Sequence, residues 1–333
     1  MSRETLAHLN SQTLIGYTTK RGNAWHYRAD MQGAEPNHYP HAIPTEDVHR
    51  RLFGWDALVA ELHAVAIVDD GVLNVVDPTR KVIVRSDNAQ ILGVVGEGYQ
   101  VHPYGEWLVS NVESILDADL RIGSAGVLRG GATAWVQIEM EDTISVEGVD
   151  FRPFLTAATS LDGSLATTYL TGCQVVVCDN TLSVALGTYD SRMKIKHSRH
   201  SLGRIGDVRE ALGIIHSVGD DFTAQVHRLI DETVSPTRWN QFVDAFTAPS
   251  STSTRAQRNS EQKAEQLHQL WLSDSRVQPW QGTAYGVLAA VNTWTHHEMP
   301  IRGADRATRN MERVIAGKVD ELDRSTLAVL ATV

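Results

Sequence analysis

The stretch Ala157–Thr181, AATSLDGSLATTYLTGCQVVVCDNT, predicts how the rest of the chain is organised. Its middle holds a polar turn, Ser160–Ser164, and its end holds the apolar run Val175–Cys178. Glycine accepts the positive φ that a tight turn needs, and asparagine or threonine can begin a helix. We therefore expect a strand, an Asp-Gly turn, a second strand, and a helix that starts at Asn180-Thr181.

Upstream of this stretch the pattern is that of β-strands. After a polar, turn-rich arm over residues 1–44, strands are expected at 62–68, 72–76, 81–85 and 90–95, with further hairpins over 120–140 and 144–156. Apolar residues at helical spacing predict one amphipathic helix over 103–117. In the strand 81–85, valines alternate with the other side chains, so Lys81 and Arg85 are expected on a largely basic face.

Downstream of this stretch the apolar period changes to that of helices. A long helix face runs from Val208 to Leu229, and Ser235-Pro236 is expected to open a helix that continues to Phe246. A small-polar linker at 248–253 precedes helices at about 254–273, 283–298, 304–317 and 319–331. The sequence therefore predicts an α+β fold, an antiparallel hairpin sheet packed with helices and followed by a helical half. The expected divisions are an arm (1–44), a β-rich core (45–204) and a helical region (205–333) with a possible break near 248–253.

Composition is that of a globular chain with an acidic balance. The formal net charge is −10, which argues against coating duplex DNA by bulk charge but leaves a local basic face open. The chain has two cysteines, Cys173 and Cys178, too few for a disulfide framework. It starts without an apolar leader and has no apolar run long enough to span a bilayer, so a cytoplasmic protein without a membrane partner is expected.

The segment Arg192–Arg204, RMKIKHSRHSLGR, carries five formal positive charges and no acid. Such local asymmetry suits a phosphate-backbone groove. A solvated edge strand protected by lysines is the alternative reading. The cations concerned, which we take as candidate DNA-binding residues, are Lys194, Lys196, Arg199 and Arg204.

A second basic candidate is the hairpin tip Arg129-Gly130-Gly131. Glycines let backbone amides approach a phosphate closely, and Arg129 could pair with it, although an ordinary flexible turn would have the same sequence. Arg80, Lys81 and Arg85 would add a further group of basic side chains. Trp135, on an otherwise polar strand face, and Tyr169 are the candidates for stacking a base.

A different chemistry is suggested by Cys178 with His197 or His200 and with Asn180. A Cys-His-Asn set can carry out acyl transfer if the fold brings the groups together, although a cysteine that ends a valine run is more often part of a core. Acid partners at ligand spacing are missing around the histidine pairs, so no metal and no cofactor is expected. Asp162 is expected to serve its turn through side-chain hydrogen bonds to the backbone.

Several short motifs, in their order along the chain, resemble the phage/plasmid-like proteins, an uncharacterised domain family of bacteriophages and actinobacterial mobile elements. They cover about residues 10–230, and one departure is Leu161, where relatives carry His. The resemblance implies a phage or mobile-element setting, and a fold-level analogy links this plan to phage single-strand annealing recombinases, which work as rings. The motifs are Trp25-His26, Gly93–Tyr99, Leu128–Gly131, Ser160–Ser164, Val177–Thr181, His197-Ser198 and Ala211–Gly213.

Together these features predict an oligomeric single-stranded-DNA-binding protein of the annealing type, non-catalytic and without a cofactor. The arm residues Trp25 and Tyr27 are expected to contact the next subunit. Two alternatives stay open at this point. One is a Cys- or metal-dependent enzyme that acts on nucleotides or a host component, and the other is a structural or host-interaction protein.

Overall fold

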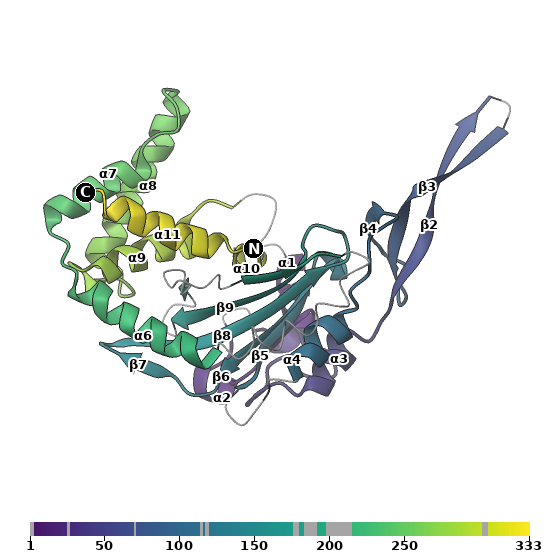
Figure 1. The fold of residues 1–333 in the computed structure, drawn as a ribbon, viewed down its shortest axis with the longest axis horizontal. Coiled ribbons are helices and arrows are strands. Elements are labelled where there is room, and N and C mark those ends of the chain that lie inside the picture. The colour runs from purple at the N-terminus through teal and green to yellow at the C-terminus, as the bar shows by residue number, and fades with distance from the viewer. Residues whose placement is uncertain are drawn as a thin grey trace. The chain divides into compact units, whose positions relative to one another are not determined.

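The computed structural model describes residues 3–24, 27–69, 71–113, 116, 120–175, 180–182, 192–197, 215–301 and 306–333 (Figure 1). The chain forms two compact units built from interleaved segments. Unit 1 comprises 1–141, 155–170 and 192–214, and unit 2 comprises 142–154, 171–191 and 215–333. Residues 1–44 thus belong to unit 1, and unit 2 draws two segments from the middle of the chain. Along the chain, strands dominate the first half and helices the second, which confirms the α+β class.

The larger sheet is antiparallel in every strand pair whose register is resolved, and its order is β1-β5-β6-β8-β9-β10, with β7 beside β8 and β11 beside β9. Its strands are β1 (Thr13–Ile15), β5 (Leu120–Leu128), β6 (Thr133–Met140), β7 (Ile144–Val146), β8 (Val149–Ser160), β9 (Thr167–Val175), β10 (Asn180–Leu182) and β11 (Arg192–Ile195).

The central stretch adopts the predicted strand, turn and strand. β8 ends at Ser160, residues 161–165 bend, and β9 begins at Thr167. The helix expected at Asn180-Thr181 is wrong. These residues form β10, in which Asn180 pairs with Val175 and Thr181 with Gln174, so their backbone groups are satisfied by the neighbouring strand rather than by a helix cap.

The arm predicted over residues 1–44 packs into unit 1. Thr13 of β1 pairs with Gly126 of β5, and Leu14, Tyr17 and Ile43 are buried. The helices of this segment and the next are α1 (Arg3–Ser11), α2 (Thr18–Arg21), η1 (Ala29–Met31) and α3 (Thr45–Leu52). The structure therefore shows this segment packed on its own unit.

The single helix expected over 103–117 is also corrected. The structure has a π-helical segment, η2 (Gly105–Ser110), followed by the short α4 (Asn111–Glu113). The apolar residues that suggested a helix are nevertheless buried, including Trp107, Leu108 and Val112. The wider π turn changes the hydrogen-bonding pattern without removing the buried face.

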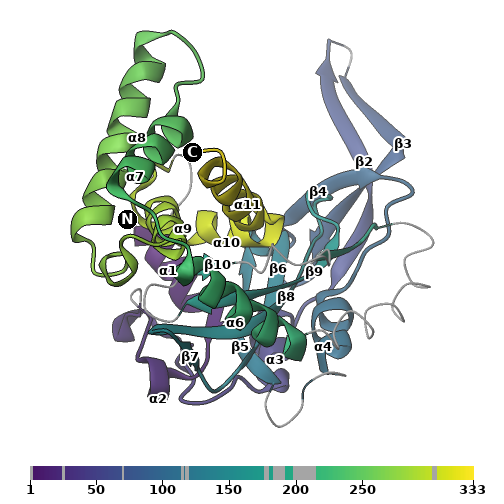
Figure 2. The same ribbon diagram turned by 60° about the vertical axis from the view of Figure 1, so that its left-hand side comes forward.

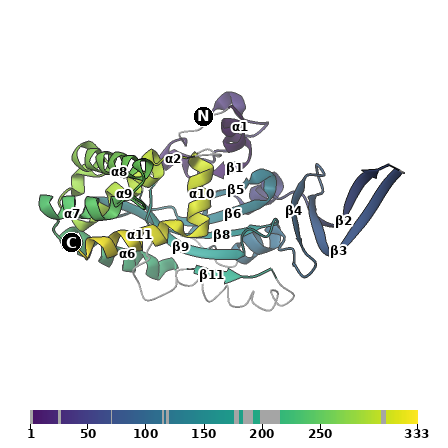
Figure 3. The same cartoon turned by 90° about the horizontal axis from the view of Figure 1, so that it is seen from above.

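The smaller sheet has the order β2-β3-β4, with β2 at Ala57–Val68, β3 at Gly71–Arg85 and β4 at Ile91–Gly96 (Figure 1, Figure 3). The separate strands expected at 72–76 and 81–85 are one strand, because a register shift at Glu61/Leu62 absorbs the extra residues of β3. Ile83 is fully buried, so the face expected to be largely basic is interrupted by an apolar contact.

The helices of unit 2 lie close to the predicted positions, and α8 matches its expected bounds. Ser235 and Ser253 accept hydrogen bonds from the backbone N–H groups of Arg238 and Ala256, which caps α7 and α8. α7 and α8 lie side by side (Figure 2). The helices are α6 (Ile215–Asp231), α7 (Pro236–Thr247), α8 (Thr254–Ser273), η5 (Gln278–Trp280), α9 (Ala284–Thr293), η6 (Trp294–Glu298), α10 (Arg306–Ala316) and α11 (Lys318–Leu330).

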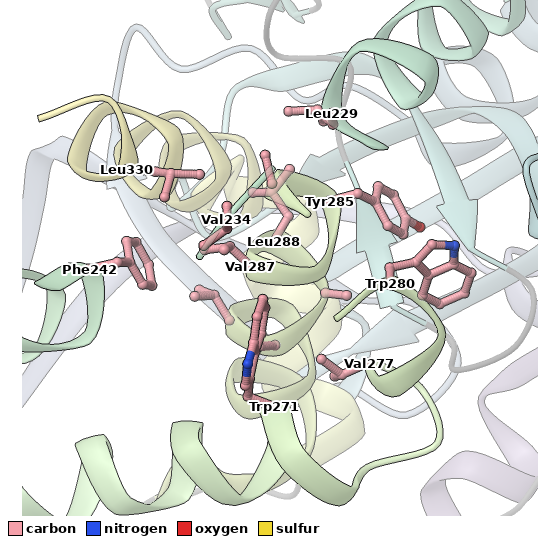
Figure 4. Close-up of a cluster of buried hydrophobic side chains, with 14 of the residues drawn as sticks. Leu229, Val234, Phe242, Trp271, Val277, Trp280, Tyr285, Val287, Leu288 and Leu330 are labelled. Atoms are coloured by element: carbon pink, nitrogen blue, oxygen red, sulfur yellow. The ribbon is translucent and has the colours of Figure 1, made fainter. Parts of the chain in front are cut away.

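These helices enclose an apolar core in which every residue of α9 is buried (Figure 4). Trp239 and Trp271 stack with their ring centroids 4.1 Å apart, and Phe222 of α6 packs on Phe151 of β8 at 4.4 Å. Among the described residues, none of the helices combines the length and the apolarity that crossing a bilayer requires.

Candidate functional site

The turn after β8 packs against β4 at a point where only glycine fits. A Cβ at Gly93 would lie 2.5 Å from the Cα of Asp162, so the two backbones are in direct contact. The backbone N–H of Ser164 donates to Oδ1 of Asp162 at 2.8 Å, which is the turn role expected for this residue, and Gly163 has φ +77°. The turn is therefore fixed both internally and by β4.

The Arg129-Gly130-Gly131 tip lies beside this turn. Nη1 of Arg129 donates to Oδ2 of Asp162 at 3.1 Å, while the Arg129 side chain remains 45% exposed. Tyr104 donates its hydroxyl to the carbonyl oxygen of Gly131 at 2.7 Å. The tip is thus anchored rather than flexible, and its arginine faces solvent beside a carboxylate.

Arg85 holds the tip from the other side. Its Nη1 donates to the carbonyl oxygen of Gly130 at 2.8 Å, and its Nε and Nη2 donate to the two carboxylate oxygens of Asp87. The guanidinium also lies over the ring of Trp55, 4.2 Å from the centroid, and the side chain is 12% exposed. All three guanidinium nitrogens of Arg85 are therefore engaged within the chain. This leaves no free nitrogen for the phosphate contact that the sequence predicted.

Four aromatic rings form a continuous stack in unit 1. His102 stacks on Trp107 with centroids 3.8 Å apart, and His197 stacks on His102 at the same distance. Tyr99 covers the other face of His197 at 4.6 Å. We call Trp107, His102, His197 and Tyr99 the ring stack. Its members come from the segment after β4, from η2, and from the residues that follow β11.

A chain of hydrogen bonds runs along the edge of the ring stack. Nδ1 of His197 donates to the carbonyl oxygen of Gln100 at 2.9 Å, so Nε2 of His197 is the acceptor for the Thr159 hydroxyl at 3.0 Å. Thr159 then accepts from Thr167 at 2.8 Å, and Thr167 accepts from Nδ1 of His102 at 2.6 Å. All donors point the same way, which is the arrangement in which hydrogen bonds strengthen one another.

Burial keeps both imidazoles neutral. Desolvation, helped by the neighbouring His197, lowers the pKa of His102 from 6.5 to about 3, and desolvation also lowers the pKa of His197. Desolvation raises the pKa of Tyr99, whose hydroxyl donates to the carbonyl oxygen of Ser160 at 2.7 Å. A Thr-His pair of this kind resembles an activated nucleophile, but the Thr159 and Thr167 side chains are fully buried and out of reach of a substrate.

The ring stack connects the two basic candidates within unit 1. Tyr99 contacts His197 on one side and approaches Gly163, next to Asp162, on the other. Asp162 pairs with Arg129, and His197 follows the exposed Lys196 directly in sequence. We call this line of contacts the basic strip: Arg129, Asp162, Gly163, Tyr99, His197 and Lys196. A continuous line of contacts thus links Arg129 to the residue next to Lys196, although the two cations lie far apart in the sequence.

The aromatic residues predicted to stack a base lie elsewhere. Trp135 and Tyr169 are both buried, and the Tyr169 hydroxyl donates to the carbonyl oxygen of Trp107 at 2.6 Å. Neither ring presents a face to solvent, because each fills the interior of the unit. Lys81 is half-buried, while Arg80 beside it is exposed.

Other predicted residues can be placed only in part. Trp25, Cys178, Arg199 and Arg204 lie outside the described residues. Lys194 belongs to β11, where it pairs with Thr168, and Asn180 belongs to β10. The half-buried Tyr27 packs edge-on against His38, with centroids 4.6 Å apart, and its contact with another subunit stays a prediction. Among the described residues, no cluster of three His, Cys, Asp or Glu side chains could hold a metal ion.

Sequence reasoning missed most of the ring stack. His197 was singled out as a partner for Cys178, but its ring contacts are Tyr99 and His102. His102 lies in a short segment between a strand and a helix, and no periodicity marks it. Thr159 and Thr167 flank the central turn, and that proximity was the one available signal.

Comparison with known proteins gives a family but no activity. A family model described as "Domain of unknown function (DUF932)" matches residues 91–316, which includes the ring stack, the central turn and most of the helices. Neither a curated protein nor a solved structure matches the chain.

Proposed function

We propose a function from geometry and charge, because the chain belongs to the DUF932 family, whose description names no activity. The proposal is a non-catalytic, oligomeric single-stranded-DNA-binding protein of the annealing type, encoded by a phage or mobile element. DNA would be held by its phosphates at the basic strip.

The basic strip is the observation that carries this proposal. Its two cations, Arg129 and Lys196, are both exposed and flank a rigid centre formed by Tyr99 and the turn at Asp162. Beyond His197 the sequence continues with the basic residues of 198–204 and no acid. In a chain with a net charge of −10, the sequence 192–204 thus carries five formal positive charges and no acid, which is the local composition that a polyanion site requires.

The burial of Trp135 and Tyr169 limits how DNA would be read. Without exposed rings at those positions, binding would depend on phosphate contacts rather than on base stacking. Such contacts carry no sequence information, and they weaken steeply as salt rises because bound counterions are released. Sequence-independent binding of this kind suits annealing, which must act on any pair of complementary strands.

The test is fluorescence anisotropy of a labelled single-stranded oligonucleotide at several salt concentrations. The double variant Arg129→Gln/Lys196→Gln should bind at least about tenfold more weakly than the wild type, and the slope of log affinity against log salt should fall by about 1.4. Lys318→Gln is the matched control, because it removes one exposed lysine from α11 in unit 2. Absence of binding by the wild type at low salt would refute the proposal, as would equal binding by the double variant.

A further inference from the structure

The outer part of the β2–β3 hairpin exposes apolar side chains that a folded chain normally buries. We call residues 62–68 and 71–77 the ribbon (Figure 1, Figure 3). Ile67 is 90% exposed and Val72 is 70% exposed. Of the large apolar side chains that are exposed within the described parts of the chain, all except Leu272 lie on β2, β3 or β4.

Both faces of the ribbon are apolar. The register places Ile67 opposite Val72 on one face, and Ala66 opposite Leu73 on the other. Residues 62–68 and 71–76 contain no Asp, Glu, Lys or Arg. Apart from Asp77 at its base, the ribbon therefore lacks the charges that ordinarily protect an exposed strand pair from association.

The size of this surface indicates a protein partner. Summed over both faces, the exposed fractions of the ribbon's large apolar side chains correspond to roughly 700 Å² of surface, and the face that carries Ile67 and Val72 holds about two thirds of it, which matches the 300–600 Å² that is typical of the largest, often functional, patch on a monomer. One partner in a stable protein–protein interface contributes about 800 Å². The Ile67/Val72 face of the ribbon thus supplies roughly half of the share that one subunit brings to a stable dimer.

We propose that the ribbon is a self-association surface, which binds the ribbon of a second copy of this chain in antiparallel orientation. The face that carries Ile67 and Val72 would pack on the same face of the second ribbon. Packed in this way around a two-fold axis, each apolar surface meets an equally apolar one.

Charge at the ends of the ribbon supports the antiparallel orientation. Asp69 lies exposed at the tip. At the base, where β3 begins to pair with β4, Arg80 lies exposed and Lys81 half-buried, next to the acids Glu61 and Asp77. Antiparallel overlap brings the tip of each ribbon toward the base of the other, so that Asp69 of one copy approaches Arg80 of the next. A parallel arrangement would instead place the two Asp69 carboxylates together.

This inference deepens the proposed function by naming the contact between subunits, and in that sense it rests on the oligomeric protein proposed above. Its test needs no DNA, however. Loss of self-association and loss of oligonucleotide binding are separate measurements, so failure of one proposal is distinguishable from failure of the other.

The first experiment measures the mass of the full chain by light scattering and sedimentation across a concentration series. Ile67→Lys/Val72→Lys places two charges on one face and should raise the Kd for self-association by roughly a hundredfold or more. Both positions are exposed, so the urea midpoint of unfolding should stay unchanged. Leu272→Lys, at a position that is 64% exposed on α8, is the matched control and should associate like the wild type.

The second experiment tests the orientation. Asp69→Lys alone should weaken association, and Asp69→Lys combined with Arg80→Glu should restore it. A wild-type chain that stays monomeric at high concentration would overturn the proposal, and so would a double-lysine variant that associates normally. Monomeric wild-type protein that floats with lipid vesicles, and no longer does so after Ile67→Lys/Val72→Lys, would assign the ribbon to a membrane and overturn it as well.

Discussion

The ribbon and the ring stack belong to the same unit, and each is an exception to the rule that polar groups are exposed and apolar groups buried. The ring stack holds polar groups in the interior, and the ribbon holds apolar groups on the surface. The ring stack buries the His102 imidazole with two threonine hydroxyls and leaves His197 half-buried, whereas the ribbon exposes Ile67 and Val72 to solvent. Polar groups can satisfy one another inside a single chain, since each donor has an acceptor nearby. An apolar surface without a covering element can be buried only by another molecule.

The two regions should therefore respond differently to substitution. Changes in the ring stack should lower the stability of the chain itself, and changes in the ribbon should leave that stability nearly constant. The following predictions test this contrast by urea unfolding at protein concentrations low enough to keep the chain monomeric.

The largest effect is expected for Trp107→Ala. Trp107 is fully buried and covers one face of His102, so its removal leaves a cavity and exposes the imidazole. The free energy of unfolding should fall by about 3–5 kcal/mol. Val94→Ala, at an exposed position of β4, is the control and should change it by less than about 0.5 kcal/mol. A loss below about 1 kcal/mol for Trp107→Ala would show that the stack does not hold the unit together.

A smaller effect is expected for Thr167→Val. This nearly isosteric change removes the hydroxyl that accepts from His102 and donates to Thr159, so two buried groups lose their partner. The expected loss is about 2–3 kcal/mol. In a double-mutant cycle, Thr159→Val/Thr167→Val should lose less than the sum of the single variants, because both belong to one chain of hydrogen bonds. Strict additivity would contradict that directional chain.

The pH dependence of stability should report the buried imidazole. The pKa of His102 is about 3 in the folded chain and 6.5 when unfolded. Between these values the unfolded chain binds the extra proton, so the free energy of unfolding falls as the pH falls from 6.5 toward 3, by up to about 1.4 kcal/mol per pH unit for this group. His102→Gln should have a shallower dependence between pH 7 and 5 than the wild type. Equal slopes would mean that His102 is as accessible to protons in the folded chain as in the unfolded one.

The smallest effect is expected in the ribbon. Ile67→Thr replaces a side chain that is 90% exposed with another β-branched residue, so the monomer should lose less than about 0.5 kcal/mol. A loss above about 1.5 kcal/mol would mean that Ile67 is buried within the chain itself, and the contrast between the two regions would then disappear.

Local features of the fold could be predicted from the sequence. The turn at Asp162-Gly163 and the serine caps of α7 and α8 depend on neighbouring residues alone, so their signals are complete in the sequence. The helix expected at Asn180-Thr181 was wrong because that prediction also used neighbouring residues alone. These residues pair with β9, where Asn180 lies opposite Val175, and a cap signal contains no information about such a partner.

The candidate site depended on long-range contacts and could be predicted only in part. Arg129 and Lys196 were both recognised as basic candidates, but nothing in the sequence indicated that Tyr99 and His197 connect them. Arg85 was assigned to phosphate because its charge was visible, whereas its engagement with Asp87 and Trp55 was not. The residue type showed which side chains carry positive charge. Their burial and contacts, which the sequence does not contain, decide which of them can reach a phosphate.

The interleaving of the two units has a consequence for how the chain is made. A ribosome releases Asp142–Phe154, the first segment of unit 2, well before it has synthesised α6 to α11. Phe151 is therefore synthesised before Phe222, the residue on which its ring packs. During synthesis this segment can pair β7 with the start of β8, but it lacks the helices on which Phe151 packs. Because both units are discontinuous, no single cut in the chain separates one from the other.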